Sequence, residues 1–323
     1  MSPPIPRRFR LWIASLLLAT ACAPALPPAA SNAEPRAAVR HDVSADDGHR
    51  LALWEKRPAA PRGALLLLHG RTWSGLPNFD LQVPGERRSL MDALAARGYA
   101  VYALDLRGYG ATTRDATGWL TPDRAVSDVA TVLDWIHEKE GGAAGPVLMG
   151  LSRGALVSAA VAQRHPQKLS AVILLGFAFD LDDKLPPTPL GQTPAKQPNT
   201  ATAAASDFIT PGAISQRAKD AFVAAALAAD PVRVDWRDDD VFNALDPAAI
   251  KVPTLLIHGE HDPLATVPKQ AKLFTRLGTG DRQWVVLPGA DHAAHLEDSQ
   301  ARLVEAVTEF IERERTGAAG GLQ

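Results

Sequence analysis

The sequence predicts an α/β fold, in which a mostly parallel, doubly wound sheet of eight strands is interrupted by one helical or irregular cap insertion. Three observations predict this fold. Short, continuous apolar runs recur along the chain, and such runs suit strands that are covered on both faces. Between them lie segments whose apolar residues recur every three or four positions, as in amphipathic helices. The alternation stops once, between residues 176 and 250.

The expected strands fall into two groups. The first two alternate apolar and polar residues and predict an antiparallel edge hairpin, whereas the later ones are apolar throughout and predict the buried, parallel part of the sheet. In chain order the expected strands are 39–45, 50–57, 65–68, 100–104, 147–149, 171–175, 254–257 and 284–287.

The expected helices connect these strands, as strand–helix–strand alternation requires. They are residues 88–97, 123–140, 153–165, 268–277 and 295–313, with a further helix at 218–229. The implied domain organisation is a core of residues 39–175 and 251–315, a cap at 176–250, and a flexible tail at 316–323. Because the cap enters after about the sixth strand, we interpret it as a lid over the site rather than a surface excursion.

Residues 1–21 are typical of an export signal, because three arginines precede an apolar run that is too short to span a bilayer. The end of this run, LLATAC, resembles a bacterial lipoprotein signal, in which cleavage leaves Cys22 as a lipid-bearing N-terminus. A plain secretory signal and an uncleaved anchor are the alternatives. Residues 22–38 are rich in alanine and proline and predict a tether. We expect a protein that is lipid-anchored in the bacterial cell envelope, or else periplasmic or secreted.

Composition argues against several other classes of function. The formal net charge of −2 gives no basic surface for nucleic acid. The single cysteine allows neither an intramolecular disulfide nor a cysteine-based metal cluster. The spacing of His292 and His295 could suit a metal, but no third ligand pattern accompanies it. We therefore expect no metal and no cofactor.

The strongest local signal is the pentapeptide Gly150-Leu151-Ser152-Arg153-Gly154, which follows an apolar run and opens a helical pattern. A serine on a sharp strand-to-helix turn needs small residues two positions before and after it, because the backbone packs tightly there. Such a turn exposes the hydroxyl at a helix N-terminus, where developing negative charge is favoured. Ser152 is therefore the expected nucleophile.

A serine hydroxyl is a weak nucleophile and needs a base, and a histidine base needs a carboxylate to orient it. His292 follows the last apolar run and is the expected base, with His295, at the start of the last expected helix, as the second choice. Asp262 follows the penultimate strand and is the expected carboxylate, with Glu260 as the near alternative.

Acyl chemistry also requires two donors for the oxyanion. The backbone N–H of Arg153, directly after the nucleophile, is one expected donor. The second is the N–H of Arg71, which follows an early strand and is preferred over that of Thr72. The side chain of His69 in the same loop is expected to be structural.

Five segments in this order resemble the α/β-hydrolase superfamily over about residues 45–315: LLLLHG, DLRGYG, GLSRG, LLIHGEHDP, and PGADH followed by Glu297. The resemblance implies the order serine, acid, histidine, and a cap after the sixth strand. It also implies that Asp105 and Arg107 of DLRGYG are structural. Dehalogenases and epoxide hydrolases of this superfamily are disfavoured, because they have aspartate at the position of Ser152.

Two departures from the superfamily concern arginines. The oxyanion loop reads HGRTWSG rather than the HGGG of many lipases. Arg153 places a long cation beside the nucleophile, where it pairs with a substrate carboxylate or with an acidic neighbour in the protein.

The expected function is that of a serine hydrolase acting on a small-molecule acyl substrate, most simply a carboxylic ester, through an acyl-enzyme. An amide or peptide hydrolase and a perhydrolase use the same triad and remain alternatives. A non-catalytic binding module with the same fold is the third. The composition of the cap gives no indication of which substrate is bound.

Overall fold

The structure is a computed structural model that describes residue 1 and residues 37–142 and 144–320. The chain divides into two units, residues 1–34 and 35–323, and every described strand and helix belongs to the second. The expected signal peptide at 1–21 and the expected lipidation site Cys22 lie outside the described residues. Within the described part of the chain, no helix combines the length and the apolar character needed to cross a membrane.

The expected sheet of eight strands is confirmed, with the strand order β1-β2-β4-β3-β6-β7-β9-β10. The β1–β2 and β2–β4 pairs are antiparallel and the other pairs are parallel. The strands are β1 (Val39–Ser44), β2 (Arg50–Lys56), β3 (Ala64–Leu68), β4 (Ala100–Leu104), β6 (Val147–Leu151), β7 (Ala171–Leu175), β9 (Thr254–Gly259) and β10 (Arg282–Leu287).

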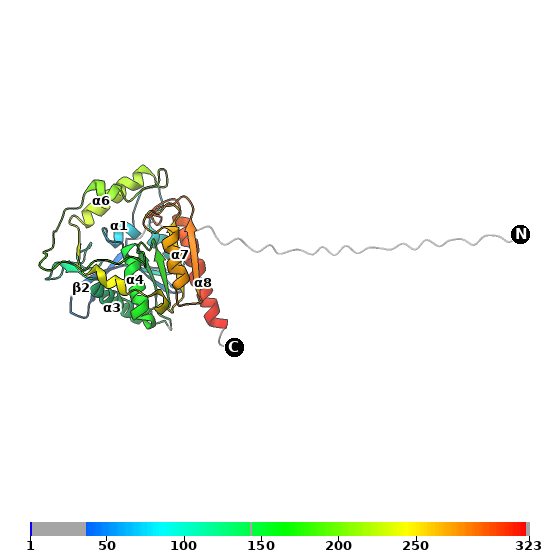
Figure 1. Cartoon of the computed structure of the whole chain (residues 1–323). Helices are drawn as coiled ribbons and strands as arrows, with labels where there is room; N and C mark the ends of the chain where they lie inside the picture. Colours follow the sequence, from blue (N-terminus) through cyan, green and yellow to red (C-terminus); the bar gives the residue numbers. More distant parts are fainter. Residues whose placement is uncertain (2–36, 143, 321–323) are drawn as a thin grey trace. The chain divides into compact units, whose positions relative to one another are not determined.

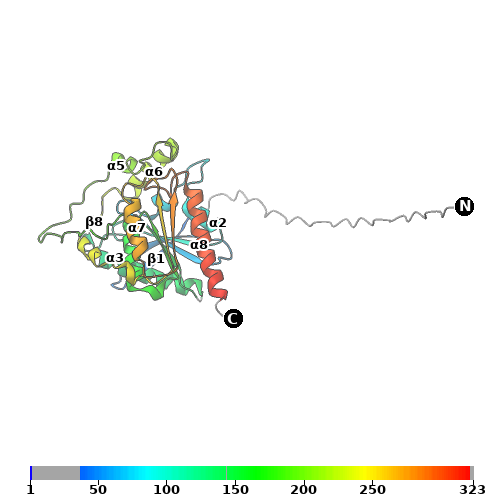
Figure 2. The same ribbon diagram turned by 45° about the vertical axis from the view of Figure 1, so that its right-hand side comes forward.

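Helices cover both faces of this sheet, and Figure 2 shows α7 and α8 on opposite sides of the strands. The helices are α1 (Gly75–Phe79), α2 (Leu90–Ala96), α3 (Pro122–Glu140), α4 (Arg153–Arg164), α5 (Ala201–Ala205), α6 (Gln216–Ala229), α7 (Val267–Arg276) and α8 (Gln300–Gly320). The short α1 was not expected, because five residues containing a glycine and a proline show no helical period.

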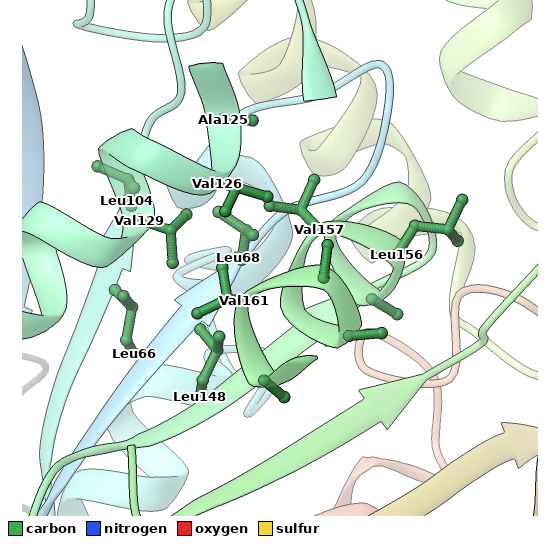
Figure 3. Close-up of a cluster of buried hydrophobic side chains, with 14 of the residues drawn as sticks. Leu66, Leu68, Leu104, Ala125, Val126, Val129, Leu148, Leu156, Val157 and Val161 are labelled. Carbon is green, nitrogen blue, oxygen red and sulfur yellow. The ribbon is translucent and has the colours of Figure 1, made fainter. Parts of the chain in front are cut away.

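Alternation along the strands divides the core into two layers. Leu66 and Leu68 pack with residues of α3 and α4, such as Val129 and Val157, and this layer is drawn in Figure 3. Their neighbours Leu65 and Leu67 point to the other face, where α2 and α8 cover them. This burial on both faces explains why these strands read as continuous apolar runs rather than as alternating ones.

The start of the last helix differs from the sequence prediction, which placed it at His295. The helix α8 begins at Gln300, and residues 292–299 form successive turns instead. Polar contacts hold these turns: Asp291 Oδ1 accepts the Ala293 N–H at 3.0 Å, and the Asp298 N–H donates to the carbonyl of Ala213 at 2.8 Å. Local periodicity favoured a helix, but contacts with the inserted segment prevent it. The same helix runs to Gly320, into the expected tail.

Residues 176–250 lie between β7 and β9, after the sixth strand of the main sheet, and contain α5, α6 and the short strand β8 (Asp235–Trp236). Figures 1 and 2 show α6 beyond one end of the strands. β8 pairs in parallel with β5 (Trp119–Leu120) outside the main sheet. A separate apolar cluster joins this segment to the loops at the carboxyl ends of the strands; it contains Trp73, Leu81, Val83, Ala204, Phe208, Ala218, Phe222, Ala226, Ala293 and Leu296.

Candidate active site

Ser152 occupies a sharp turn between β6 and α4, with φ 55° and ψ −115°. A non-glycine residue rarely adopts a positive φ, so the turn is a strained conformation that its surroundings hold in place. A Cβ on Gly150 would lie 2.2 Å from the Gly154 carbonyl oxygen, and one on Gly154 would lie 2.4 Å from that of Leu68. Both flanking positions therefore require glycine. The Ser152 side chain makes no capping hydrogen bond to α4, so its hydroxyl is not used by the helix.

His292 and Asp262 form a hydrogen-bonded pair, with His292 Nδ1 2.7 Å from Asp262 Oδ2. The other carboxylate oxygen of Asp262 accepts the backbone N–H groups of Leu264 and Ala265, each at 2.9 Å. Burial raises the pKa of Asp262, but the bonds from His292 and from these two amides outweigh it and hold the pKa below its ordinary value. The ionised carboxylate assigns the His292 proton to Nδ1 and leaves Nε2 as the acceptor.

A cavity of about 410 Å³ brings the predicted residues together. Ser152 and His292 line it, and Asp262 lies behind His292 with a fully buried side chain. Most of the remaining wall is apolar, with Leu156, Phe179, Leu185, Phe222, Leu264 and Leu296. The volume lies within the range of sites for small ligands.

Arg71 and Arg153 line the same cavity. Arg153 is the first residue of α4, so its backbone N–H has no acceptor within the helix. The loop after β3 passes close to the nucleophile, because a Cβ on Gly70 would lie 3.5 Å from the Cβ of Ser152. The hydroxyl of Tyr109 donates to the carbonyl of Arg71, and the indole of Trp236 donates to that hydroxyl at 2.8 Å. These bonds hold the carbonyl of the peptide between Arg71 and Thr72, and His69 Nδ1 lies 2.8 Å from the carbonyl oxygen of the preceding peptide, that of Gly70.

The structure places His292 on Asp262 and gives the second-choice residue, His295, other partners. His295 Nε2 lies 3.1 Å from Asn78 Oδ1, while the amide nitrogen of Asn78 donates to two backbone carbonyls. Burial lowers the pKa of His295 to about 3, so the ring is neutral. The alternative acid, Glu260, is half-exposed and accepts the N–H of Gly289 at 2.9 Å.

The other conspicuous residues of the early loops have structural partners. His69 Nε2 accepts the Leu106 N–H at 3.2 Å, and burial lowers the pKa of His69 to about 4. Asp105 accepts the N–H groups of Trp54 and Gly75. Arg107 binds the buried Asp128 with two bonds of 2.8 Å.

Two acidic residues of the inserted segment were not predicted. Asp239 binds both terminal nitrogens of Arg153, at 2.6 and 3.0 Å, so the partner of Arg153 is an acidic neighbour in the protein. Asp207 lines the cavity and accepts the Trp73 indole N–H at 2.7 Å; burial raises its pKa to about 6. No motif surrounds either residue, so the sequence carries no signal for their positions.

Comparison with known proteins gives one family and several relatives. The model of the family described as serine aminopeptidase, S33, matches residues 59–299. A monoacylglycerol lipase of Mycolicibacterium smegmatis is 26% identical over 261 residues, covering 78% of this chain and 88% of the relative. A 2-hydroxymuconate semialdehyde hydrolase of Pseudomonas putida is 27% identical, with coverage of 64% and 75%. The solved structure of the esterase RhEst1 from Rhodococcus superposes with a TM-score of 0.63 at 21% identity, over 84% of this chain and 98% of the other.

Proposed function

The chain belongs to the serine aminopeptidase S33 family, within the α/β-hydrolase superfamily, and on this premise we propose that it is a serine hydrolase that cleaves an ester-like acyl bond. The observation that carries the proposal is the Asp262–His292 pair, which stands beside a cavity that Ser152 also lines. Those three groups are what nucleophilic acyl transfer needs: a nucleophile, a base for its proton, and an anion that stabilises the protonated base.

In the proposed reaction the Ser152 oxygen attacks the substrate carbonyl carbon while His292 Nε2 takes the hydroxyl proton. The carbonyl oxygen becomes an oxyanion that accepts the backbone N–H groups of Arg71 and Arg153. Collapse of this intermediate breaks the bond to the alcohol, which leaves with the proton from His292. Water then attacks the acyl-enzyme by the same route, releasing the acid and restoring Ser152.

The character of the cavity supports a small or medium-sized substrate with an apolar part. Most of its wall is apolar and includes several leucine and phenylalanine side chains, and its volume is about 410 Å³. Relatives whose names specify lipase and esterase favour an ester as the bond that is cleaved.

A fluorophosphonate probe, which reacts covalently with activated serines, tests the nucleophile. We expect the probe to label the wild-type protein at Ser152 and not to label Ser152→Ala. Ser158→Ala is the matched control, since Ser158 lies on the same helix with a buried hydroxyl that has no hydrogen-bond partner among the described residues. Wild-type protein that takes up no probe would favour the non-catalytic binding module.

An amide or peptide hydrolase is the second candidate function, and Asp207 is the observation that favours it. This carboxylate lines the cavity and would pair with the protonated amine of an aminoacyl substrate. A panel of 4-nitrophenyl esters and aminoacyl anilides decides between the two candidates. Turnover of esters alone supports the esterase, whereas faster turnover of the anilides would replace it with an aminopeptidase.

We also propose that residues 1–21 direct export and that Cys22 carries a lipid. The support is the sequence pattern of basic residues, apolar run and cysteine. The test is cell fractionation of the full chain, with Cys22→Ser as the variant. Membrane association that is lost in the variant supports lipidation; soluble wild-type protein outside the cytoplasm indicates plain secretion instead.

A further inference from the structure

Two arginines beside the cavity share a single carboxylate. Two guanidinium groups, those of Arg71 and Arg153, lie on residues that line it, and the carboxylate of Asp239 contacts both. Arg153 makes the closer contact with this carboxylate, through two hydrogen bonds of 2.6 and 3.0 Å. The Arg153 guanidinium also lies over the rings of Trp236 and Phe242, at 4.9 and 5.6 Å. Arg153 is therefore fully engaged within the protein.

Arg71 is not engaged in the same way. Within the described part of the chain its guanidinium makes one long hydrogen bond, 3.4 Å from Nη1 to Asp239 Oδ2, an oxygen that Arg153 already binds at 3.0 Å. Its Nε–H is buried and has no hydrogen-bond partner among the described residues. The Arg71 side chain remains 42% exposed, and Arg71 is one of the residues that line the cavity. A buried donor without an acceptor is unfavourable unless a ligand or water satisfies it.

The electrostatic surroundings of Arg71 are short of negative charge. Burial lowers the pKa of Arg71, and the cations of Arg153 and Arg233 lower it further, while Asp239 opposes them. The guanidinium nevertheless stays charged at any working pH. The carboxylate that lines the cavity, Asp207, is bonded to Trp73 and influenced by His292 rather than by Arg71. An additional anion beside Arg71 would balance the positive charge of its guanidinium.

We propose that the Arg71 guanidinium binds a carboxylate group of the substrate, so that the enzyme prefers esters that carry a second, ionised carboxyl group. This inference rests on the proposed esterase function. The guanidinium presents a planar fork of donors that matches a carboxylate in two parallel bonds. Because the backbone N–H of Arg71 is also an expected oxyanion donor, one residue would hold both the reacting carbonyl and the carboxylate.

A purely structural role is the rival explanation. In that case the Arg71–Asp239 contact only attaches the inserted segment to the core, and loss of either partner would damage the site for every substrate equally. The two explanations predict different effects of replacing Asp239 on the preference for anionic esters. If Arg71 binds substrate, removing the competing carboxylate of Asp239 leaves more of the guanidinium free and strengthens the preference for anionic esters.

The experiment compares kcat/KM for matched esters in the full chain at neutral pH. The acyl pair is mono-4-nitrophenyl adipate and 4-nitrophenyl hexanoate, which differ by a terminal carboxylate. The alcohol pair is 4-hexanoyloxybenzoate and phenyl hexanoate, which places the carboxylate on the other side of the scissile bond. The measured quantity is the ratio of anionic to neutral substrate within each pair, so general damage to the site cancels.

In one of the two pairs we expect Arg71→Gln to lower the ratio about tenfold or more, the loss typical of a charge-assisted hydrogen bond. Arg71→Lys should retain part of the preference, and Asp239→Asn should raise it. The pair that responds shows which side of the ester carries the carboxylate. Ratios that stay at the wild-type value in both arginine variants would overturn this inference alone. Wild-type protein that hydrolyses none of the four esters would overturn the proposed esterase function and this inference with it.

Discussion

The cavity is built by two regions that are constructed differently. Ser152 directly follows β6, and Asp262 and His292 lie on the loops after β9 and β10. Continuous ladders of backbone hydrogen bonds hold these strands in register. Asp207 and Phe222 come from the inserted segment 176–250, which has two α-helices, two short 3-10 helices and no strand of the main sheet. The first region positions the three residues of the proposed triad, and the second supplies part of the cavity wall.

The inserted segment is attached to the core by many polar contacts, and at two points a single carboxylate accepts two backbone N–H groups. Asp230 accepts the backbone N–H groups of Ser74 and Gly110, at 2.7 and 2.8 Å. Asp291 accepts those of Ile209 and Thr210, at 2.8 and 2.5 Å. From this difference between the regions we expect the proposed chemistry to depend on residues held by the sheet, and selectivity to depend on the inserted segment.

The largest expected effect belongs to the core side of this comparison. Asp262→Asn should lower kcat about 10⁴-fold, because an amide can neither fix the Nδ1–H tautomer of His292 nor stabilise its cation. Steady-state kinetics with 4-nitrophenyl esters measures it. Glu260→Gln is the matched control two residues away, and its half-exposed side chain should tolerate the change. A large loss in the control with none in Asp262→Asn would transfer the acid role to Glu260.

A matched pair of truncations compares how the two regions are stabilised. Phe310 and Phe222 are both almost fully buried, the first on the core-facing side of α8 and the second in the cluster that contains the inserted segment. Phe310→Ala should lower the free energy of unfolding by about 3–5 kcal/mol, because the dense core cannot close the cavity. Phe222→Ala should lower it less, because the inserted segment can loosen by itself.

Urea denaturation measures the loss of global stability in each variant, and limited proteolysis measures the loosening of the inserted segment. We expect Phe222→Ala to increase cleavage within residues 176–250 and to raise KM, since Phe222 lines the cavity. Equal losses of global stability in the two variants would show that core and insertion unfold as one cooperative unit, and the two regions would then not differ in stability.

The sequence predicted the core side of the comparison far better than the other. Strands such as β4 and β7 were predicted to the residue, because burial on both faces leaves a continuous apolar run. The turn at Ser152 was predictable because close approach of two backbones requires Gly150 and Gly154. Constraints of this kind act on neighbouring residues, so a short stretch of sequence is enough to predict the structure.

The remaining features depend on contacts between distant residues. Asp239 meets Arg153 across 86 positions of the chain, and no spacing in the sequence indicates it. The helix expected at His295 is replaced by turns because Asp298 bonds to the inserted segment. The unequal sharing of Asp239 between Arg153 and Arg71 likewise requires the folded arrangement of both regions.

The junction between the two regions contains a buried acid pair whose titration should weaken it. Glu297 is 1% exposed, and its carboxyl oxygen accepts the N–H of Asp291, the residue that holds Ile209 and Thr210. Burial, and then the neighbouring Asp291, raise the pKa of Glu297 from 4.5 to about 8. Glu297 is therefore neutral in the folded protein at pH 7 and ionised in the unfolded chain.

The smallest expected effect is the pH dependence that this pair produces. Between pH 4.5 and 8 the folded state binds the proton that the unfolded state releases, so Glu297 makes stability fall as pH rises, by at most about 1.4 kcal/mol per pH unit. The lowered pKa values of His69 and His295 act in the opposite sense, but only below pH 6.5. The raised pKa values of Asp105 and Asp207, each about 6, act in the same sense as that of Glu297, but mostly below pH 7. Urea denaturation between pH 7 and 8 therefore isolates the glutamate. Glu297→Gln stays neutral and keeps both an acceptor and a donor, so its stability should be nearly flat over this range. An identical slope in the variant and the wild type would show that the acid pair does not set the strength of the junction.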